Sequence, residues 1–289
     1  MTRPRNNLIG AGWMTLSMAL FAVEDALLKL VLQSIPIGQT LMMFGALGTI
    51  FFVSWAMIKG QPIVRREMLS RLMIIRFGFE ITGRLFYFLA VALTTLSSAT
   101  IILQATPIIV VAAASMLFKE QVGPRRWIAV AIGFLGVLIV LRPAVDAFSP
   151  LSILAVIGLI GFAGRDLTSR MAPPVLGLIG LGSTGFFALT MSGIVYGIWA
   201  GETMVAPTLA DIRMILGITA TGLIAYLSLM TAMRTGDVSS VTPFRYTRLI
   251  FGVSLGVLFF GESLDGITIT GSALIVASGL FILWRGSSA

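Results

Sequence analysis

The sequence contains no cysteine and no histidine, and only 11% of its 289 residues are Asp, Glu, Lys or Arg. The missing cysteine excludes disulfides and thiol chemistry, and without either residue a Cys/His zinc site is excluded. The commonest general base near neutral pH is also absent. Because a soluble domain has about 25% charged residues, the low charge, 57% hydrophobic residues and a mean hydropathy of +1.00 indicate an integral membrane protein.

A formal net charge of +8 at pH 7 suggests nucleic acid as a partner. The basic residues, however, form no single stripe. They lie between hydrophobic runs, where the excess of Lys and Arg in cytoplasmic loops of membrane proteins explains them better. We therefore expect a lipid bilayer, and no nucleic acid, around this chain.

Ten apolar runs follow one another along the chain, each bounded by turn residues or charges. This number agrees with about 20 residues for each spanning helix plus short loops. The runs cover residues 8–30, 37–58, 72–93, 97–118, 127–141, 151–167, 175–199, 214–233, 238–260 and 267–284. The pattern predicts an all-α integral membrane protein with ten transmembrane helices.

The charges between the runs predict how the chain is oriented. With the N-terminus inside, twelve Lys or Arg residues fall on the inner side, and only Arg142 and Arg213 fall on the outer side. This bias predicts that both termini are cytoplasmic. An even number of spans agrees with that orientation.

The chain also repeats itself. A shift of 142 residues places Ser97–Glu120 on Ser239–Glu262 without a gap, and two serines, a threonine, a phenylalanine and a glutamate coincide. Each unit holds five runs, and because five is odd, the second must enter the membrane from the opposite side. We therefore expect two inverted repeats, residues 1–142 and 151–289, joined by a linker at 143–150, as in many secondary transporters.

A resemblance to a known family is carried by FYFLAVALTTLSSATIILQATPIIVVAAASMLFKEQVGPRRWIAVAIGFLGVLIVLRP, residues 86–143. This stretch resembles the second half of an EamA domain of the drug/metabolite transporter superfamily. Residues 232–286 resemble the same element again, and both copies contain Phe-x-Glu. AVEDALLKL and PFRYTRLIF, from Ala22 and Pro243, are most similar to a bacterial branch that includes S-adenosylmethionine uptake carriers and amino-acid or metabolite exporters. The resemblance implies two EamA domains and a transport function, and it implies little about the substrate.

Two arginines, Arg245 and Arg248, lie well inside an apolar run. An unpaired arginine at the bilayer centre costs about 2.5–3.5 kcal/mol, and residues three apart share one helical face. Either acids on other helices neutralise them, or they line a wet cavity that admits an anionic group. We expect them to bind a carboxylate in two places, as guanidinium groups do, with Tyr246 adding a stacking surface.

The third run carries Arg76, Glu80 and Arg84 at helical i, i+4, i+8 spacing. One interpretation is a self-neutralising ladder that lets a polar stripe cross the bilayer. The other is that Glu80 and Arg84 face a central cavity, while Arg76 extends its charge to the cytoplasmic interface.

Acids occupy repeat-equivalent positions in the first and sixth runs. Asp25 and Lys29 are spaced as an i, i+4 pair, which leaves Glu24 without a partner on its own helix. Arg165 adjoins Asp166, and Arg170 lies four residues after the aspartate. In inverted repeats Asp25 and Asp166 would lie at different depths, as a pair of alternating gates requires. Two structural salt bridges at helix ends are the equally weighted alternative.

Glycines in the apolar runs favour close helix packing. Gly180, Gly182 and Gly185 spell GxGxxG, but no strand precedes them, so helix packing explains them better than dinucleotide binding. Small residues also mark the fifth and tenth runs, at Gly133, Gly136, Gly271 and Gly279. We expect these peripheral helices to pack on one another or to support a homodimer.

The embedded charges are six bases and four acids, an excess of two positive charges. A zwitterion satisfies both signs, so we predict a secondary active transporter of a small zwitterionic or amphiphilic metabolite, such as an amino acid or derivative, working by alternating access in the bacterial inner membrane. An S-adenosylmethionine-like or cationic drug or metabolite carrier is the alternative. An intramembrane hydrolase with an Asp25/Asp166 dyad and a non-transporting scaffold are the alternatives of other classes.

The sequence thus predicts binding and gating residues but no catalytic residue, metal or cofactor. The predicted substrate-binding residues are Glu24, Glu80, Arg84, Gln104, Arg245, Tyr246 and Arg248. The predicted gating or proton-coupling residues are Asp25, Lys29, Arg165 and Asp166.

Overall fold

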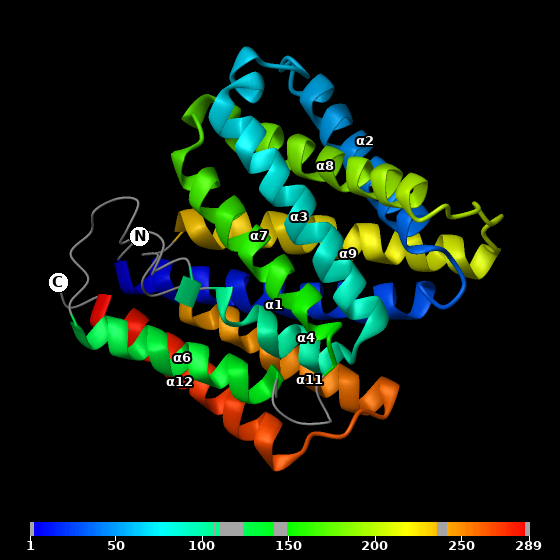
Figure 1. The fold of residues 1–289 in the computed structure, drawn as a ribbon. Helices are drawn as coiled ribbons and strands as arrows, with labels where there is room; N and C mark the ends of the chain where they lie inside the picture. Colours follow the sequence, from blue (N-terminus) through cyan, green and yellow to red (C-terminus); the bar gives the residue numbers. More distant parts are fainter. Residues whose placement is uncertain (1–2, 107, 110–123, 142–148, 236–241, 287–289) are drawn as a thin grey trace.

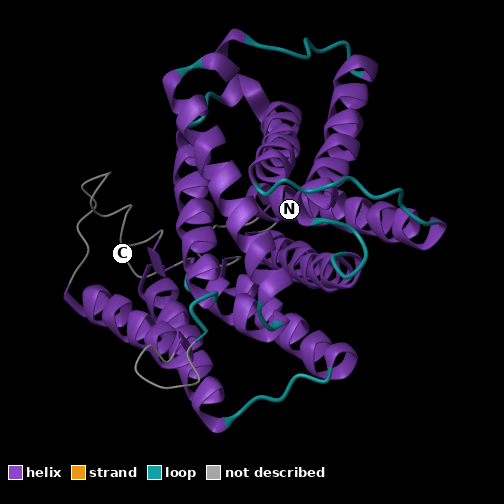
Figure 2. Ribbon diagram, turned by 45° about the vertical axis from the view of Figure 1, so that its right-hand side comes forward, coloured by secondary structure: helices purple, strands orange, loops and turns teal. Residues whose placement is uncertain are grey.

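A computed structural model describes residues 3–106, 108–109, 124–141, 149–235 and 242–286, and this part of the protein is all-helical (Figures 1 and 2). Its ten α-helices are α1 (Arg3–Val31), α2 (Ile37–Ile58), α3 (Arg71–Leu93), α4 (Leu96–Leu103), α6 (Pro124–Leu141), α7 (Ser152–Met171), α8 (Gly177–Trp199), α9 (Leu209–Thr235), α11 (Thr247–Phe260) and α12 (Gly266–Gly286). Three short 3-10 helices are η1 (Arg66–Leu69), η2 (Pro174–Leu176) and η3 (Thr242–Tyr246). The all-α prediction is confirmed.

Four helical segments in the described residues are long and apolar enough to cross a membrane. They are Ile37–Ile58, Ser152–Ser169, Pro174–Trp199 and Leu209–Ala232. Helices α1 and α3, with 29 and 23 residues, are also long, but charged side chains interrupt their apolar sequences. The count of ten spans therefore stays a prediction, and the structure supports its coarser form, a helical protein with several membrane-span candidates.

Local sequence signals explain several helix ends. The side chains of Ser70 and Thr95 cap α3 and α4 by accepting hydrogen bonds from the N–H groups of Met73 and Ser98, as N-cap hydroxyls do. Helices α8 and α11 are each followed closely by a glycine with positive φ, Gly201 at 62° and Gly261 at 63°. Glycine adopts this left-handed conformation without steric cost, so the chain can leave the helix there.

The most extended helix contacts all join the first half of the chain to the second. They are α1 with α9, α2 with α8, α3 with α7 and α6 with α12. Figure 1 shows α2 lying beside α8 at the top and α6 beside α12 at the bottom. The two halves are therefore interleaved, and their contact surface runs through the whole protein.

Glycines allow these helices to approach closely, as the sequence predicted. A Cβ atom on Gly161 of α7 would lie 2.5 Å from Cα of Gly83 in α3. On Gly182 it would lie 2.5 Å from the ring of Phe52, which agrees with helix packing rather than nucleotide binding. Gly136 of α6 faces the carbonyl of Gly271 in α12, so this face is used within the chain. Dimer formation stays a prediction.

One end of the helix bundle is held together by polar contacts between the two halves. We call it the clasped end, and it comprises the connections at residues 32–36, 94–95, 200–208 and 261–265. Ser34 Oγ donates to Asp211 Oδ1 at 2.5 Å, and the N–H of Gly38 donates to Glu202 Oε2 at 2.8 Å. The side chain of Gln39 exchanges two hydrogen bonds with the backbone of Val205, at 2.7 and 2.9 Å.

Glu262 provides the second part of the clasped end. It follows Gly261 and accepts hydrogen bonds from the N–H groups of Leu96 and Ser97, at 2.7 and 2.9 Å, and from Lys29 Nζ at 3.0 Å. Burial raises the pKa of this carboxyl, but the hydrogen bonds from Ser97, Lys29 and Leu96 outweigh burial and hold the pKa below its ordinary value. The carboxylate therefore ties α11 to α1 and to the start of α4.

Some predicted features lie outside the described residues. These are Phe118 and Glu120 of the first Phe-x-Glu, the side chain of Arg170, and all but Ser149 and Pro150 of the linker at 143–150. The start of α1 and the end of α12 are described, and both lie on the left side of the bundle in Figure 1.

Candidate functional site

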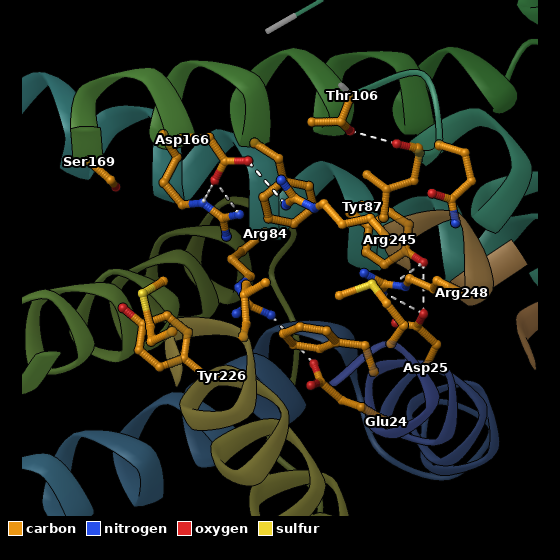
Figure 3. Close-up of a pocket in the computed structure, with 18 of the residues that line it drawn as sticks. Glu24, Asp25, Arg84, Tyr87, Thr106, Asp166, Ser169, Tyr226, Arg245 and Arg248 are labelled. Carbon is orange, nitrogen blue, oxygen red and sulfur yellow. Dashed lines mark hydrogen bonds and ion pairs between the residues drawn. The ribbon is translucent and has the colours of Figure 1, made fainter. Parts of the chain in front are cut away.

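A pocket of about 320 Å³ lies between the two halves of the chain (Figure 3). Helices α1, α3, α7, α8, α9 and α11 and the 3-10 helix η3 contribute to its lining, together with residues at the end of α4. Its volume falls at the lower end of the range of about 300–1,000 Å³ that is usual for small-molecule sites. Its charged lining residues are Glu24, Asp25, Arg76, Arg84, Arg165, Asp166, Arg245 and Arg248.

Arg248 binds an acid of α1. Its Nη2 lies 2.7 Å from Asp25 Oδ2, and Tyr87 donates its hydroxyl to the same oxygen at 3.0 Å. The guanidinium also lies over the rings of Phe21 and Tyr87, at 5.1 and 5.5 Å. A cation over an aromatic face is attracted by the ring electrons, so charge pairing and ring contacts hold Arg248 in place.

The prediction that Asp25 pairs with Lys29 is wrong. Helical spacing permits that pair, but Asp25 faces the pocket and Arg248, whereas Lys29 lies at the clasped end. There Lys29 binds Glu262 and the carbonyl of Thr94, both at 3.0 Å. Spacing within one helix does not decide the partner when another helix presents a better-placed one.

Glu80 stands at the centre of three arginines. Its Oε1 accepts a hydrogen bond from Arg165 Nη1 at 3.4 Å and lies 3.6 Å from Arg84 Nε. Its Oε2 accepts a hydrogen bond from Arg76 Nη2 at 3.3 Å. The predicted ladder of Arg76, Glu80 and Arg84 therefore exists, and α7 adds Arg165. Glu80 itself lies behind the pocket lining, with a side chain that is 4% exposed.

The prediction that Arg76 extends to the membrane interface is wrong. The residue is only 2% exposed. Its Nε donates to Ser169 Oγ at 2.8 Å and its Nη1 to Thr184 Oγ1 at 3.2 Å. These hydroxyls of α7 and α8, together with Glu80, satisfy the guanidinium inside the protein, so it has no need to reach water.

Asp166 binds two arginines. Its Oδ1 lies 2.8 Å from Arg165 Nη2, and its Oδ2 receives Arg245 Nη2 at 3.3 Å. Arg245 lies on η3 and Arg248 on α11, and they bind different acids. The prediction that the two arginines act together from one helical face is therefore wrong. Asp25 and Asp166 likewise bind separate arginines, which does not match the shared-proton dyad of an aspartyl hydrolase.

The described charges of this cluster come close to balance. Five arginines, Arg76, Arg84, Arg165, Arg245 and Arg248, face four carboxylates, Glu24, Asp25, Glu80 and Asp166. The excess is one positive charge, where the sequence predicted two, because Lys29 is paired at the clasped end. Buried charges inside a membrane are usually paired in this way.

Several buried polar atoms of the pocket-lining side chains have no hydrogen-bond partner among the described residues. They are Glu24 Oε2, Gln104 Nε2, Tyr226 OH and Arg248 Nε. Buried polar groups without partners are costly, so atoms of this kind mark where a polar ligand would bind. Phe21, Tyr87, Phe162 and Tyr226 add aromatic surface to the same pocket.

The structure brings most predicted site residues together. Glu24, Arg84, Gln104, Arg245 and Arg248 line the pocket, as do Asp25, Arg165 and Asp166. Tyr246 is buried, at 5% exposure, but is not part of the lining. Sequence reasoning missed Tyr87, Phe162 and Tyr226, because an aromatic residue in an apolar run gives no sign of whether it faces a cavity.

Comparisons with known proteins match this architecture. Residues 8–142 fit the model of the EamA-like transporter family. The chain is 24% identical to the S-adenosylmethionine uptake transporter of Rickettsia bellii, over 97% of this chain and 95% of that protein. It is 25% identical to the riboflavin transporter of Rhizobium johnstonii, over 97% of this chain and 92% of that protein. It is also 25% identical to the pseudopaline exporter CntI of Pseudomonas aeruginosa, over 89% of this chain and 90% of the exporter.

A solved crystal structure covers 100% of this chain and 100% of its own, with a TM-score of 0.62 and 17% sequence identity. At this identity the likeness shows a common fold alone.

Proposed function

We propose that this protein is a secondary active carrier of a zwitterionic metabolite, a membrane transporter and not an enzyme. The match of residues 8–142 to the EamA-like transporter family, and the relatives named as transporters along almost the whole chain, support this. The observation that carries the proposal is the pocket between the two halves, which is aromatic and lined by both signs of charge. Arginines there offer sites for a carboxylate, and Glu24 offers one for an ammonium group.

We further propose that residues 1–142 and 151–289 are two inverted repeats, with both termini cytoplasmic in a bacterial inner membrane. The repeat pairs α1 with α7, α2 with α8, α3 with α9 and α6 with α12, and it places the end of α4 on η3, just before α11. Exchanging the units converts the contact of α1 with α9 into that of α7 with α3, and both contacts occur. Such exchange symmetry supports a two-fold relation between the halves.

Alternating access would then require the clasped end to open. On α8 and α11 the pocket lies away from it, because Leu181 and Arg248 are within the first five residues of those helices, whereas on α1 the pocket reaches Asp25, six residues before the helix ends. The clasped end is the other end of both helices, where Glu202 and Glu262 bind the first half. This conformation would therefore be closed at the clasped end, with the part of the pocket on α8 and α11 nearer the opposite end of the bundle.

The chemistry of the relatives' named substrates is compatible with this pocket. S-adenosylmethionine carries an α-amino-acid group and a planar base, and riboflavin carries a planar ring system. Arginine grips a carboxylate with two N–H groups, and aromatic side chains such as Phe21 and Tyr226 can stack on planar rings. A purely cationic substrate is the competing proposal, and it depends on Glu24 and Asp25 rather than on the arginines.

The test is transport by the purified protein in proteoliposomes. Vesicles loaded with unlabelled amino acids, S-adenosylmethionine or polyamines would be diluted into labelled substrate, with and without an imposed pH gradient. Counterflow of a zwitterion above empty vesicles is the expected result. Counterflow of polyamines alone would favour the cationic alternative, and absence of any uptake across the panel would refute the proposal.

A further inference from the structure

The charged residues of the pocket region fall into two groups of opposite net charge. One group contains the adjacent acids of α1, Glu24 and Asp25, together with Arg248, which pairs with Asp25, and it has one negative charge in excess. The other contains Arg76, Arg84, Arg165, Arg245, Glu80 and Asp166, with two positive charges in excess. The small overall surplus therefore hides a separation of charge, with a negative side at α1 and a positive side at α3 and α7.

The two groups meet at Glu24 and Arg84. Figure 3 shows these side chains pointing toward one another, and the contact is a single one, from Arg84 Nη1 to Glu24 Oε1 at 3.4 Å. Charge-assisted hydrogen bonds are usually about 2.7–2.9 Å long, and the pairs of Arg248 with Asp25 and of Arg165 with Asp166 are 2.7 and 2.8 Å. The contact between the groups is therefore longer than these two pairs, and it is as long as the ion pairs of Glu80 with its arginines, at 3.3–3.6 Å.

Both residues also have unused hydrogen-bonding capacity. Glu24 is 2% exposed, and its Oε2 has no partner in the described part of the chain. Arg84 has five N–H donors, and its further ion pair, with Glu80, is 3.6 Å long. Arg248 also has a donor without a partner in the described residues, Nε, but its Nη2 is held by Asp25 at 2.7 Å and its guanidinium is flanked by two rings.

We propose that Glu24 and Arg84 together bind the head group of an α-amino acid, with the ammonium on Glu24 and the carboxylate on Arg84. This inference rests on the proposed function and assigns its carboxylate site to Arg84 rather than to Arg245 and Arg248. Binding exchanges one ion pair for two, so neither buried charge is left without a partner. Arg165 lies close enough to assist, because it and Arg84 contact the same oxygen of Glu80.

The geometry also restricts the substrate class. Glu24 and Arg84 are neighbours, so the ammonium and carboxylate they bind must be close together, as they are when both are attached to one carbon atom. Zwitterions whose charges are separated by several carbon atoms would not satisfy both residues at once. The side chain of the substrate would lie against Phe162, whose ring contacts the guanidinium groups of Arg84 and Arg165 at 5.8 and 4.8 Å.

The test combines ligands that lack one charged group with variants that lack the matching side-chain charge. Thermal-shift titrations of the full chain would use the free α-amino acids, their amides, which lack the carboxylate, and the corresponding acids without the amino group. Glu24→Gln, Arg84→Gln and the double variant would be compared with wild type and with Arg213→Gln, an exposed control outside the pocket. The double variant removes both charges and so leaves no unpaired ion.

Each single variant should weaken α-amino-acid binding about ten- to a hundredfold, the usual worth of a charged hydrogen bond. Glu24→Gln should bind the deaminated acid as well as the amino acid, and Arg84→Gln should bind the amide as well. A merely structural role would weaken all three ligands alike, and that result would overturn the assignment. If no α-amino acid stabilises wild type, the proposed function fails as well, whereas a wild-type response that both variants retain overturns only this inference.

Discussion

Replacing Gly161 by alanine should force α3 and α7 apart and destabilise the protein. The new Cβ atom would lie 2.5 Å from Cα of Gly83 and 3.0 Å from the carbonyl oxygen of Phe79, and closer still to the N atom of Gly83. All three are backbone atoms, so no side-chain rotation can relieve the overlap. Overpacking of this kind costs about 1–3 kcal/mol, which outweighs the gain of up to about 1 kcal/mol from removing a helical glycine.

Two other glycines test whether the destabilisation depends on the atoms that the new Cβ would meet. A Cβ atom on Gly164, one turn later, would meet the ring of Phe79, which can rotate away, so Gly164→Ala should be milder. Gly78 lies on α3 itself, and a Cβ atom added there would have nothing within 4 Å, so Gly78→Ala should leave stability unchanged or raise it slightly. The expected order of destabilisation is Gly161→Ala, then Gly164→Ala, then Gly78→Ala.

The assay is thermal unfolding in detergent, followed by ligand titration of whichever variants fold. Because α3 and α7 carry Arg84 and Arg165, Gly161→Ala should also weaken binding of any ligand that contacts both. If Gly161→Ala unfolds at the same temperature as Gly78→Ala, the close contact between these helices does not constrain the protein and the reasoning is wrong.

The remaining predictions concern the two places where acids join the halves. In this cysteine-free chain, a single Ala99→Cys reporter, buried at 0% exposure near the start of α4, should react several-fold faster with a maleimide when Glu262→Gln removes the carboxylate. Because the pKa of Glu262 is lowered, its stabilising effect is complete above the ordinary value of 4.5 and is lost as the pH falls through the lowered value. Since the thiolate is the reacting form and its fraction falls with pH, each labelling rate is divided by the rate for the unfolded chain at the same pH. In the chain that keeps Glu262 this ratio should rise only below about pH 4.5, and a ratio that is the same at all pH values would contradict the clasp. Arg248→Gln should destabilise by about 3–5 kcal/mol because Asp25 stays buried without its cation, and thermal unfolding should show recovery in Asp25→Asn plus Arg248→Gln; no recovery would mean that packing on Phe21 and Tyr87 dominates.

Sequence patterns predicted the helices and the position of the charges along them. The ladder of Arg76, Glu80 and Arg84 was correct because i, i+4 neighbours on one helix are close whatever surrounds them. The pair of Asp25 with Lys29 has the same spacing and was wrong. Residues from elsewhere in the chain, Arg248 and Glu262, approach these two side chains more favourably, and single-helix spacing contains no information about such partners.

The polar contacts of Arg76 illustrate the same limit. From the sequence, an arginine early in a spanning helix is expected to reach the interface, because Glu80, the acid one turn away on its own helix, is shared with Arg84. The structure supplies Ser169 and Thr184 from two helices of the other half. Neither hydroxyl stands out in the sequence, and only the packing of α7 and α8 against α3 gives it a role.

The same interleaving links binding to the relation between the halves. Arg165 of the second half contacts Glu80 of the first, and Glu80 in turn lies against Arg84. If a substrate carboxylate binds Arg84 as we propose, it competes with Glu80 for Arg84 and Arg165, and one of the ion pairs that joins the halves is weakened. A ligand can shift a conformational equilibrium only by interacting differently with the two states. A substrate carboxylate at this point meets that condition. Arg165 and Glu80 belong to different halves, so their ion pair depends on how the halves are arranged.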